Sequence, residues 1–405
     1  MELKLDQWAT TPPAGYPGAI PPPPGKRVAG FTNGEEAPAG YFNHAWDALA
    51  DTQNELVNLI TGAGLTSSES DLSQVLRAIN KLITRRAELA GITQWVDLAP
   101  PGAQYTTLSI AAGSLSVVAV GNAPYRISSF AARNHEWEIP SPDASYSGQF
   151  NDVCWSAAFN RFVAVGRTGE IQDSVDTTDG ALTWLRRATG GSDWRACAAG
   201  PAAVVVVGDS GAIKSTVDGT TYTSRTTAYS GLAMYGVAYS PSLNVFAAVG
   251  SGGMMQRGNS TGTTWTPMLS SAFGSANVIG VTWSSEYAMF FAWNTAGAVL
   301  KSSDGLTWTM AISAVDFVTG TIGAVVALPE HLVVMSKHID CTYVKLYRVD
   351  ALNGSPAAVA TFNILPSADN ETCYRLIRVP AGLAFAGRLL LACENARIRV
   401  SHFLG

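Results

Sequence analysis

The chain has 405 residues, which is more than one ordinary domain needs, although a β-propeller can use more than about 250 residues as one closed unit. Charged residues make up 14% and hydrophobic residues 47%, with 39 glycines and 11 tryptophans, and this mixture favours many short strands joined by tight turns over a helical enzyme. The net charge of -5 leaves no basic excess to neutralise phosphates, so we expect neither nucleic acid nor an anionic membrane surface as a partner.

The first forty residues are expected to form an extended arm. Prolines recur through residues 9 to 25 and end in the run Pro21 to Pro24, a composition that favours polyproline conformation and cannot build a packed core. The alternative is a disordered linker. Residues 1 to 8 carry an acid early and no apolar segment of signal-peptide length, and no later stretch reaches 18 uninterrupted apolar residues, so we expect no insertion into a bilayer.

Residues 41 to 90 are predicted to form a helical hairpin that serves as an oligomerisation stalk. Apolar residues alternate at spacings of four and three, as a coiled-coil seam requires, and a polar glutamine inside the seam can fix register and strand number. The seam positions are Phe42, Trp46, Leu49, Gln53, Leu56 and Ile60. A second helix follows from Ser68 with one apolar face. The alternative is an ordinary amphipathic helix that packs on this second helix.

This region carries a family resemblance. The stretch Gly30-Phe-Thr-Asn-Gly-Glu-Glu-Ala-Pro-Ala-Gly-Tyr-Phe-Asn43, a helix, and then Ser70-Asp-Leu-Ser-Gln-Val-Leu-Arg-Ala-Ile-Asn-Lys81 resemble the N-terminal segment of tailed-phage tail fibre and tail-associated proteins. The resemblance covers roughly residues 25 to 85. It implies attachment to phage tail or baseplate proteins, often as a homotrimer, and a location in the virion tail after synthesis in the bacterial cytoplasm.

From about residue 91 to the C-terminus the sequence repeats. Phe162-Val-Ala-Val-Gly166, Val204-Val-Val-Val-Gly208 and Phe246-Ala-Ala-Val-Gly250 place their final glycines 42 residues apart, and Gly121, Asn294, Ser336 and Cys393 fill the same slot in other units. Most intervals fall in the range of about 40 to 50 residues that marks propeller blades, and seven anchors predict about seven blades. A glycine three residues after four of the anchors predicts a tight hairpin with positive φ.

Aromatic residues recur at both edges of these units, and we interpret them as core residues that pack blade against blade rather than as ligand-stacking residues. They include Trp155, Tyr239 and Trp283 on one edge and Trp184, Tyr222, Trp265 and Trp308 on the other. The segments Thr177-Thr-Asp-Gly, Ser215-Thr-Val-Asp-Gly and Ser302-Ser-Asp-Gly resemble the Asp-box turn of sialidase-like propellers, which joins the third and fourth strands of a blade. We assign these turns a structural role.

The two ends of the repeat region are complementary. The last unit stops after its third strand, near residues 397 to 402, while Gln94-Trp-Val-Asp97 reads as a fourth strand without a blade. We expect residues 93 to 98 to pair with 397 to 402 and close the ring, which removes an open sheet edge.

Signs of catalysis or metal binding are sparse. The five histidines have no metal-site spacing, no nucleophile motif occurs, and the five scattered cysteines are expected to be mostly or entirely free. We therefore expect no metal, no cofactor and no enzymatic activity. A glycosidase with two carboxylates brought together by distant loops is the alternative that leaves no linear signature.

Strand parity points to a ligand face. If Asp-box turns join third and fourth strands, the second-to-third hairpins and the connections between blades share the opposite face, and exposed loops on a rigid scaffold often carry recognition. That face would gather the longer connections at 141 to 149 and 270 to 276. Its candidate ligand-binding residues are Asn122, Tyr125, Arg167, Asp209 and Asn294.

The sequence therefore predicts a mainly β protein in which a propeller follows a Pro-rich arm and a helical hairpin. We expect a phage tail fibre or receptor-binding protein that attaches to the tail through its N-terminal region and binds a host-surface glycan or protein through the propeller. The alternatives are a glycan-cleaving tailspike and a structural component of the tail tip or baseplate.

Overall fold

The computed structural model consists of two compact units, residues Met1–Thr84 and Arg85–Gly405. It describes residues 57–65, 75, 77–79, 82, 95–97, 106–122, 127–131, 136–138, 148–177, 182–227, 229–268, 274–315, 321–337, 343–363, 373–380, 383, 388–393 and 398–401. The Pro-rich arm and the seam residues Phe42, Trp46, Leu49, Gln53 and Leu56 lie outside these residues. None of the helices in the described part of the chain is long and apolar enough to span a membrane.

The described part of the first unit is helical. Residues 57–62 form one helical segment, and residues 75, 77–79 and 82 are also helical. Ile60 is 4% exposed and belongs to a small apolar cluster with Ala63 and Ala78, against which Val75 and Leu82 pack. The seam residue Ile60 therefore contacts apolar residues of its own chain.

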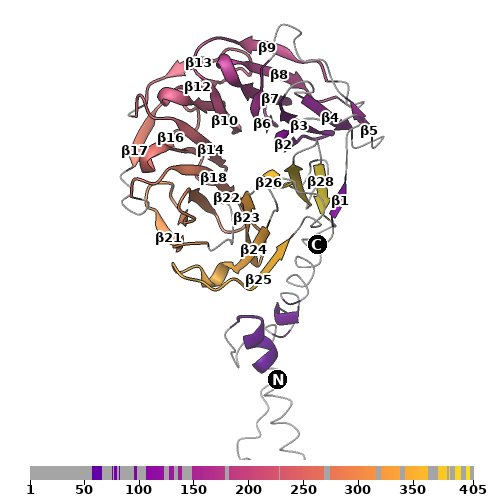
Figure 1. Cartoon of the computed structure of the whole chain (residues 1–405), viewed down its shortest axis with the longest axis vertical. Helices are drawn as coiled ribbons and strands as arrows, with labels where there is room; N and C mark the ends of the chain where they lie inside the picture. The colour runs from indigo at the N-terminus through magenta and orange to yellow at the C-terminus, as the bar shows by residue number, and fades with distance from the viewer. Residues whose placement is uncertain are drawn as a thin grey trace, which may run out of the picture. The chain divides into compact units, whose positions relative to one another are not determined.

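The second unit is a β-propeller (Figure 1). Its described strands form seven antiparallel four-stranded sheets, which we call blades and name by their first strands. The first four blades contain β2 (Thr107–Ala112), β3 (Ser116–Gly121), β4 (Ile127–Ala131) and β5 (Glu136–Glu138); β6 (Phe150–Ser156), β7 (Arg161–Gly166), β8 (Ile171–Val175) and β9 (Leu185–Ala188); β10 (Trp194–Ala199), β11 (Val204–Gly208), β12 (Ile213–Thr216) and β13 (Thr223–Arg225); and β14 (Met234–Ser240), β15 (Val245–Gly250), β16 (Met255–Gly258) and β17 (Trp265–Met268).

The remaining three blades continue the same order. They contain β18 (Val278–Ser284), β19 (Met289–Asn294), β20 (Val299–Ser302) and β21 (Thr309–Ile312); β22 (Thr321–Ala327), β23 (His331–Lys337), β24 (Tyr343–Arg348) and β25 (Ala360–Asn363); and β26 (Cys373–Arg378), β27 (Leu389–Cys393), β28 (Ile398–Ser401) and β1 (Trp95–Asp97). β1 pairs antiparallel with β28, with Trp95 opposite Ser401. The outer strand of the last blade thus comes from the segment that precedes the first blade in sequence.

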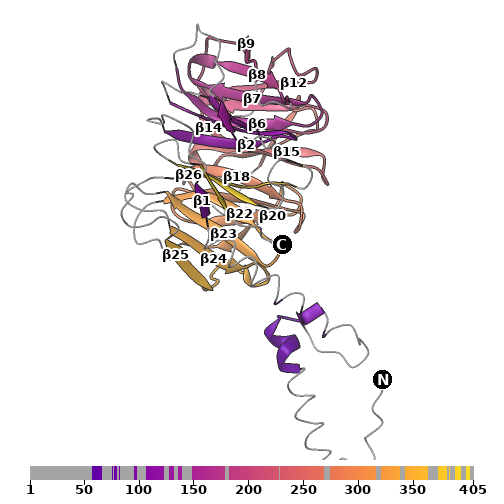
Figure 2. The same ribbon diagram turned by 90° about the vertical axis from the view of Figure 1, so that its right-hand side faces the viewer.

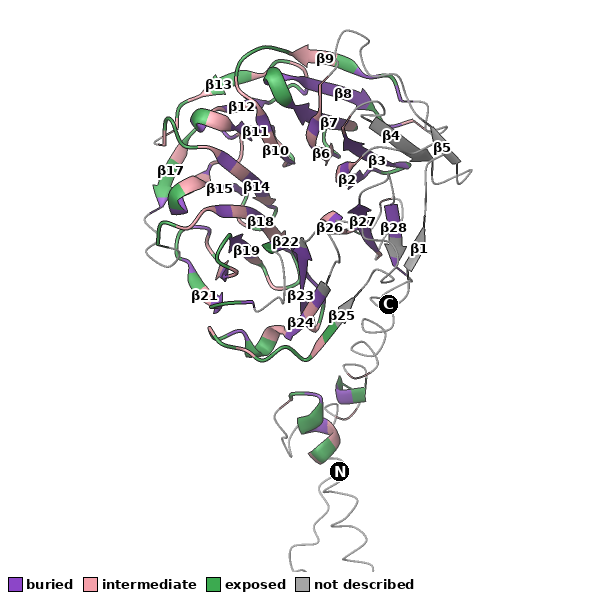
Figure 3. Ribbon diagram, in the orientation of Figure 1, coloured by how far each residue is buried: buried purple, intermediate pink, exposed green. Residues whose placement is uncertain are grey.

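The first strands surround the centre of the ring, and the fourth strands lie at its periphery (Figure 1). Each first strand contacts the first strand of the next blade, and β26 contacts β2. Turned by 90°, the ring is seen from its side (Figure 2). The second strands are almost entirely buried, and β11 is buried along its whole length, because neighbouring blades cover both faces of each sheet (Figure 3). The predicted propeller class is confirmed.

The recurring glycines at the ends of second strands have a steric cause. In β15, Gly250 is extended, with φ of -170°, so its φ is open to any residue. A Cβ at Gly250 would lie 2.1 Å from the carbonyl oxygen of Ala233, which precedes the first strand of the same blade. That carbonyl accepts a hydrogen bond of 2.9 Å from the backbone N–H of Ser251. Glycine therefore allows the start of the blade to contact its second-to-third hairpin.

The second recurring glycine has a conformational cause. Gly169, Gly211, Gly253 and Gly297 have φ between 72° and 82°, in the left-handed region that favours glycine. Three of them end the short 3₁₀ turns η2 (Arg167–Gly169), η3 (Asp209–Gly211) and η4 (Ser251–Gly253), which join second to third strands; a further 3₁₀ turn, η5 (Val349–Ala351), follows β24. The predicted positive-φ hairpins are confirmed.

In blades β10 and β18, the segments that resemble an Asp-box join the third and fourth strands. Asp304 Oδ1 accepts hydrogen bonds from the backbone N–H groups of Leu306 and Thr307, both at 2.7 Å, and Gly305 has a φ of 70°. Asp218 makes the same contacts in blade β10. In blade β14 a neutral residue does this, because Asn259 Oδ1 accepts from Thr263 at 2.8 Å. The side chain holds its own turn, in agreement with a structural role.

We predict that Asp304→Ala lowers the free energy of unfolding by about 1 kcal/mol at pH 7, measured by urea denaturation, because two backbone N–H groups lose their acceptor. Partial burial raises the pKa of Asp304, but the hydrogen bonds from Thr307 and Leu306 outweigh this effect and lower it. Because the folded pKa is depressed, the stabilisation is present above the unfolded value of about 3.9 and lost below it. The difference from wild type should therefore shrink below about pH 4. The matched Asp304→Asn variant should lose only a few tenths of a kcal/mol, as Asn259 suggests; an equal loss in both variants would contradict this account.

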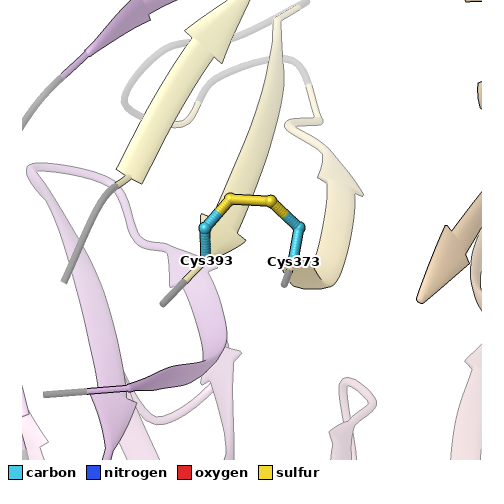
Figure 4. Close-up of a disulfide and its surroundings, with 2 residues drawn as sticks. All are labelled: Cys373 and Cys393. Carbon is cyan, nitrogen blue, oxygen red and sulfur yellow. A yellow bond between two sulfur atoms is a disulfide. The ribbon is translucent and has the colours of Figure 1, made fainter. Parts of the chain in front are cut away.

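Two of the four described cysteines form a disulfide, so the cysteines are not all free as the sequence analysis allowed. Cys373 and Cys393, 20 residues apart, face each other as register partners on β26 and β27 (Figure 4). Cys393 occupies the anchor slot that glycine fills in other blades, and spacing along the chain does not reveal that Cys373 is its cross-strand neighbour. Cys154 and Cys197 are free, and Cys341 lies outside the described residues.

Candidate functional site

The second-to-third hairpins and the connections between blades share one face of the propeller. Asp209 N–H donates to the carbonyl of Asp193 at 3.0 Å, and Thr295 N–H donates to that of Asn277 at 3.0 Å. In both pairs a hairpin contacts the connection that enters the same blade. This is the face on which strand parity placed the candidate ligand-binding residues.

Two candidate residues on this face already have partners within the fold. Asp209 forms a two-point ion pair with Arg195 of β10, at 2.9 and 2.7 Å, and the hydrogen bonds that Arg195 donates to this carboxylate raise the pKa of Arg195. Asn294 is 2% exposed, and its Oδ1 accepts from the backbone N–H groups of Ala296 and Ala298 at 3.1 and 2.8 Å. Asn294 therefore stabilises its own turn, and burial keeps it from presenting its side chain to a ligand.

The other candidates differ in how far they are exposed. Arg167 is exposed on η2, and Asn122 is half-buried after β3 with its Oδ1 buried. Tyr125 lies outside the described residues, as do most of the connections at 141 to 149 and 270 to 276. In sequence, Asn122 and Tyr125 both fall between β3 and β4, whereas Arg167, Asp209 and Asn294 belong to three other blades. No described contact brings two of the described candidates together.

Each first strand carries a β-bulge near this same face. The register shifts near the beginning of all seven described first strands, after the first paired residue in six of them and after the second in β22, so each first strand carries one extra residue relative to its partner strand. These residues are Leu108, Asn151, Arg195, Tyr235, Ile279, Gly323 and Tyr374, and all are half-buried. Asn151 Nδ2 donates to the carbonyl of Trp194 at 2.6 Å, so this bulge residue connects blades β6 and β10.

A cavity of about 640 Å³ lies among the inner strands of blades β18, β22 and β26. We call it the axial cavity. Its walls come from Val281 to Glu286 at the end of β18, from Ala324 to Ala327 on β22, from Arg375 to Pro380 at the end of β26, and from Trp293 on β19. Because Ser285 and Glu286 follow a first strand, the cavity extends toward the face that carries the Asp-box turns. The ligand face predicted from the sequence is the opposite one.

The axial cavity exists because blade β22 presents small side chains at the centre. Ala327 ends β22 at the position that Trp155 occupies in β6, Tyr239 in β14 and Trp283 in β18. Each of those rings packs on a phenylalanine of its own second strand, as Trp283 does on Phe290 with 4.7 Å between ring centroids. Alanine leaves that volume unfilled. Trp283 therefore both packs in the core, as predicted, and lines the cavity.

An ion pair crosses the axial cavity. Arg378 Nη1 at the end of β26 contacts Glu286 Oε1 in the turn after β18, 92 residues away in sequence, and their side chains are 27% and 29% exposed. Blade β22 lies between these two blades, so the pair spans the cavity past its alanines. Of the residues that line the cavity, Glu286 is the single carboxylate.

Arg375 is the second arginine of this site, and its side chain is 38% exposed. Its nearest described carboxylate oxygen is Asp152 Oδ1, 3.9 Å from Nη2, which is beyond hydrogen-bond distance. Asp152 is already satisfied: it accepts from Ser109 Oγ at 2.6 Å and from the backbone N–H of Cys197 at 2.9 Å. Among the described residues, the Arg375 guanidinium makes no hydrogen bond, and its donors remain available at the cavity wall.

Sequence reasoning did not identify Arg375, Arg378 or Glu286. A column-by-column comparison of the repeats holds a signal, because Arg375 stands where β14 and β18 have Gly236 and Gly280. In the part of the chain that the structure describes, no group of three or more His, Cys, Asp or Glu residues is arranged to hold a metal ion.

Comparison with known proteins places this architecture among solved propellers. A structure of YCF48 bound to D1 peptide matches with a TM-score of 0.54 and 14% identity, covering 76% of this chain and 96% of that one; YCF48 from Cyanidioschyzon merolae matches with a TM-score of 0.54 and 14% identity over 76% and 98%. A catalytically inactive virginiamycin B lyase from Staphylococcus aureus with quinupristin matches with a TM-score of 0.61 and 9% identity over 76% and 99%. These likenesses show the fold alone. No protein-family model matches the sequence, and no curated protein does.

Proposed function

We propose that this chain is a tail fibre or receptor-binding protein of a bacteriophage, whose propeller binds a host-surface glycan or protein in the axial cavity. The observation that carries the binding role is the cavity itself, with one arginine whose donors have no hydrogen-bond acceptor in the described structure. Its volume of about 640 Å³ falls within the range of about 300–1,000 Å³ typical of ligand sites. Rigid inner strands hold its walls, so little ordering is needed on binding.

Two further considerations support a binding role. Among the structural neighbours, YCF48 is bound to D1 peptide and the virginiamycin B lyase is in a structure with quinupristin, so this architecture accommodates ligands in other proteins. In this chain, seven blades in one ring closed by β1 and β28 would give the cavity a fixed frame without an open sheet edge.

The tail role rests on the sequence. The segment from residue 25 to 85 resembles tail fibre attachment segments, a resemblance that implies a trimer, and the heptad spacing from Phe42 to Ile60 favours self-association. Three propellers per fibre and several fibres per virion would convert weak single-site binding into firm attachment, because later contacts form at high effective concentration.

The experiment compares the full-length chain with a variant whose cavity is filled. Ala327→Trp introduces the side chain that β6 and β18 carry at the same position, so we expect it to fold and to reduce binding to host cells at least tenfold. Leu306→Trp, at a residue 43% exposed on an Asp-box turn, is the matched control and should bind like wild type. If the folded Ala327→Trp variant binds host cells as strongly as wild type, the axial cavity is not the binding site. If the protein releases reducing ends from host polysaccharide, it is a tailspike instead.

A further inference from the structure

The charge of the axial cavity points to the chemistry of its ligand. Of the residues that line it, Arg375 and Arg378 are cationic and Glu286 is anionic. Arg378 and Glu286 neutralise each other, which leaves the charge of Arg375 without a hydrogen-bonded partner among the described residues. A guanidinium carries five N–H donors in a planar fork, which matches two oxygens of a carboxylate or phosphate.

We propose that the axial cavity binds a negatively charged saccharide, with the carboxylate or phosphate group of the sugar on Arg375; this inference rests on the proposed binding function. Arg375 lines the cavity with a side chain that is 38% exposed, and its planar fork can meet two oxygens of one acidic group at the same time. Asp152 is held by Ser109 and the Cys197 N–H, and it stays in place as a weak neighbour 3.9 Å away.

The part of the cavity wall that comes from blade β18 suits a sugar better than an acidic peptide. Thr282 and Ser285 add hydroxyl groups that make no side-chain hydrogen bond within the described structure, and Trp283 between them adds part of an indole ring. The hydroxyls of a sugar can form hydrogen bonds with Thr282 and Ser285, and the apolar face of its ring can pack on the indole of Trp283. An extended peptide would instead need backbone partners along the wall, yet the first strands curve around the ring centre in separate blades.

Glu286 limits which anions enter. Its carboxylate lies across the cavity from β26, and Arg378 holds it. Replacing Glu286 by glutamine removes the only negative charge in the described lining and frees the Arg378 guanidinium. The geometry thus predicts opposite effects from two residues of one cavity: loss of anion binding in Arg375→Gln and a gain in Glu286→Gln.

The test uses the full-length chain on an array of bacterial oligosaccharides in three matched sets, neutral, uronic-acid-containing and phosphorylated, with acidic peptides as a fourth set. We expect binding confined to one or both anionic sugar sets, and the set that binds identifies the group. Arg375→Gln should weaken that binding about tenfold or more, Arg375→Lys should recover part of it because the charge remains without the fork, and Glu286→Gln should strengthen it.

Folding of the variants is checked by thermal unfolding, since Arg375 makes no described hydrogen bond and its removal should leave the transition near that of wild type. Binding to neutral sugars, unaffected by Arg375→Gln, would overturn this inference and leave the proposed function standing, as would binding confined to the acidic peptides. Absence of binding to every array member and to host cells would overturn the proposed function itself. If Arg375→Gln does not fold, the test uses Arg375→Lys and Glu286→Gln instead. If these two folded variants bind anionic sugars as strongly as wild type does, the inference is overturned.

Discussion

Gly250→Val should lower the free energy of unfolding by about 3–4 kcal/mol, because the first side-chain carbon has no space. Its Cβ would lie 2.1 Å from the carbonyl oxygen of Ala233, 2.3 Å from Met254 Cε and 3.0 Å from Met234 Cα. The end of the Met254 side chain can move away. The other two atoms belong to the backbone at the start of β14, so they can move only if the strand moves. Valine is a favourable strand residue, so its propensity would offset rather than cause the loss. Urea denaturation measures the difference.

The matched control lies two residues away on the same hairpin. Gly252 has a φ of 65° and no heavy atom within 4 Å of an added Cβ. Blades β6 and β10 have Thr168 and Ser210 at this position, with φ of 56° and 58°. Gly252→Ser should therefore cost about 1 kcal/mol at most. A similar loss in both variants would show that the hairpin tolerates no side chain at all, and that the contact with Ala233 is not the cause.

The repeat could be predicted from sequence because one steric requirement recurs in successive blades. The contact between the start of a blade and its hairpin demands glycine at Gly208 and Gly250. Together with Gly166 these residues make the 42-residue spacing visible without any structure. The sequence does not reveal the steric reason for these glycines, because the carbonyl that an added Cβ would contact belongs to a residue about 15 positions earlier in the chain. Asn294 shows the consequence: it occupies the slot, and its amide supports the turn rather than a ligand.

The axial cavity could not be predicted in the same way, because it arises where one repeat lacks the large aromatic side chain that others carry. Alanine at 327 is unremarkable in a sequence, and becomes informative only beside Trp155, Tyr239 and Trp283 in aligned first strands. Glu286 and Arg378 come from blades that are not adjacent in sequence or in the ring. Interactions of that kind leave no linear pattern, whereas hairpins and Asp-box turns are local and do.

Asp173→Ala should also be strongly destabilising, by about 3 kcal/mol, because it leaves two arginines without their shared carboxylate. Asp173 on β8 is 0% exposed and accepts from Arg187 Nε at 2.7 Å, Arg187 Nη2 at 3.0 Å and Arg161 Nη1 at 2.9 Å. The two arginine side chains are only 19% and 23% exposed, so water replaces the lost acceptor incompletely.

An exposed pair of the same chemistry separates burial from charge. Asp350 also accepts two hydrogen bonds from one arginine, Arg348, at 3.0 and 2.5 Å, but the two side chains are 45% and 33% exposed. Asp350→Ala should cost at most about 0.5 kcal/mol, since water solvates what remains. Raising NaCl from 0.15 to 1 M should reduce even that small difference and leave most of the Asp173→Ala deficit, because salt screens exposed pairs far more than buried ones. Equal, salt-sensitive losses at both positions would mean that the burial of Asp173 contributes nothing to the strength of its ion pairs.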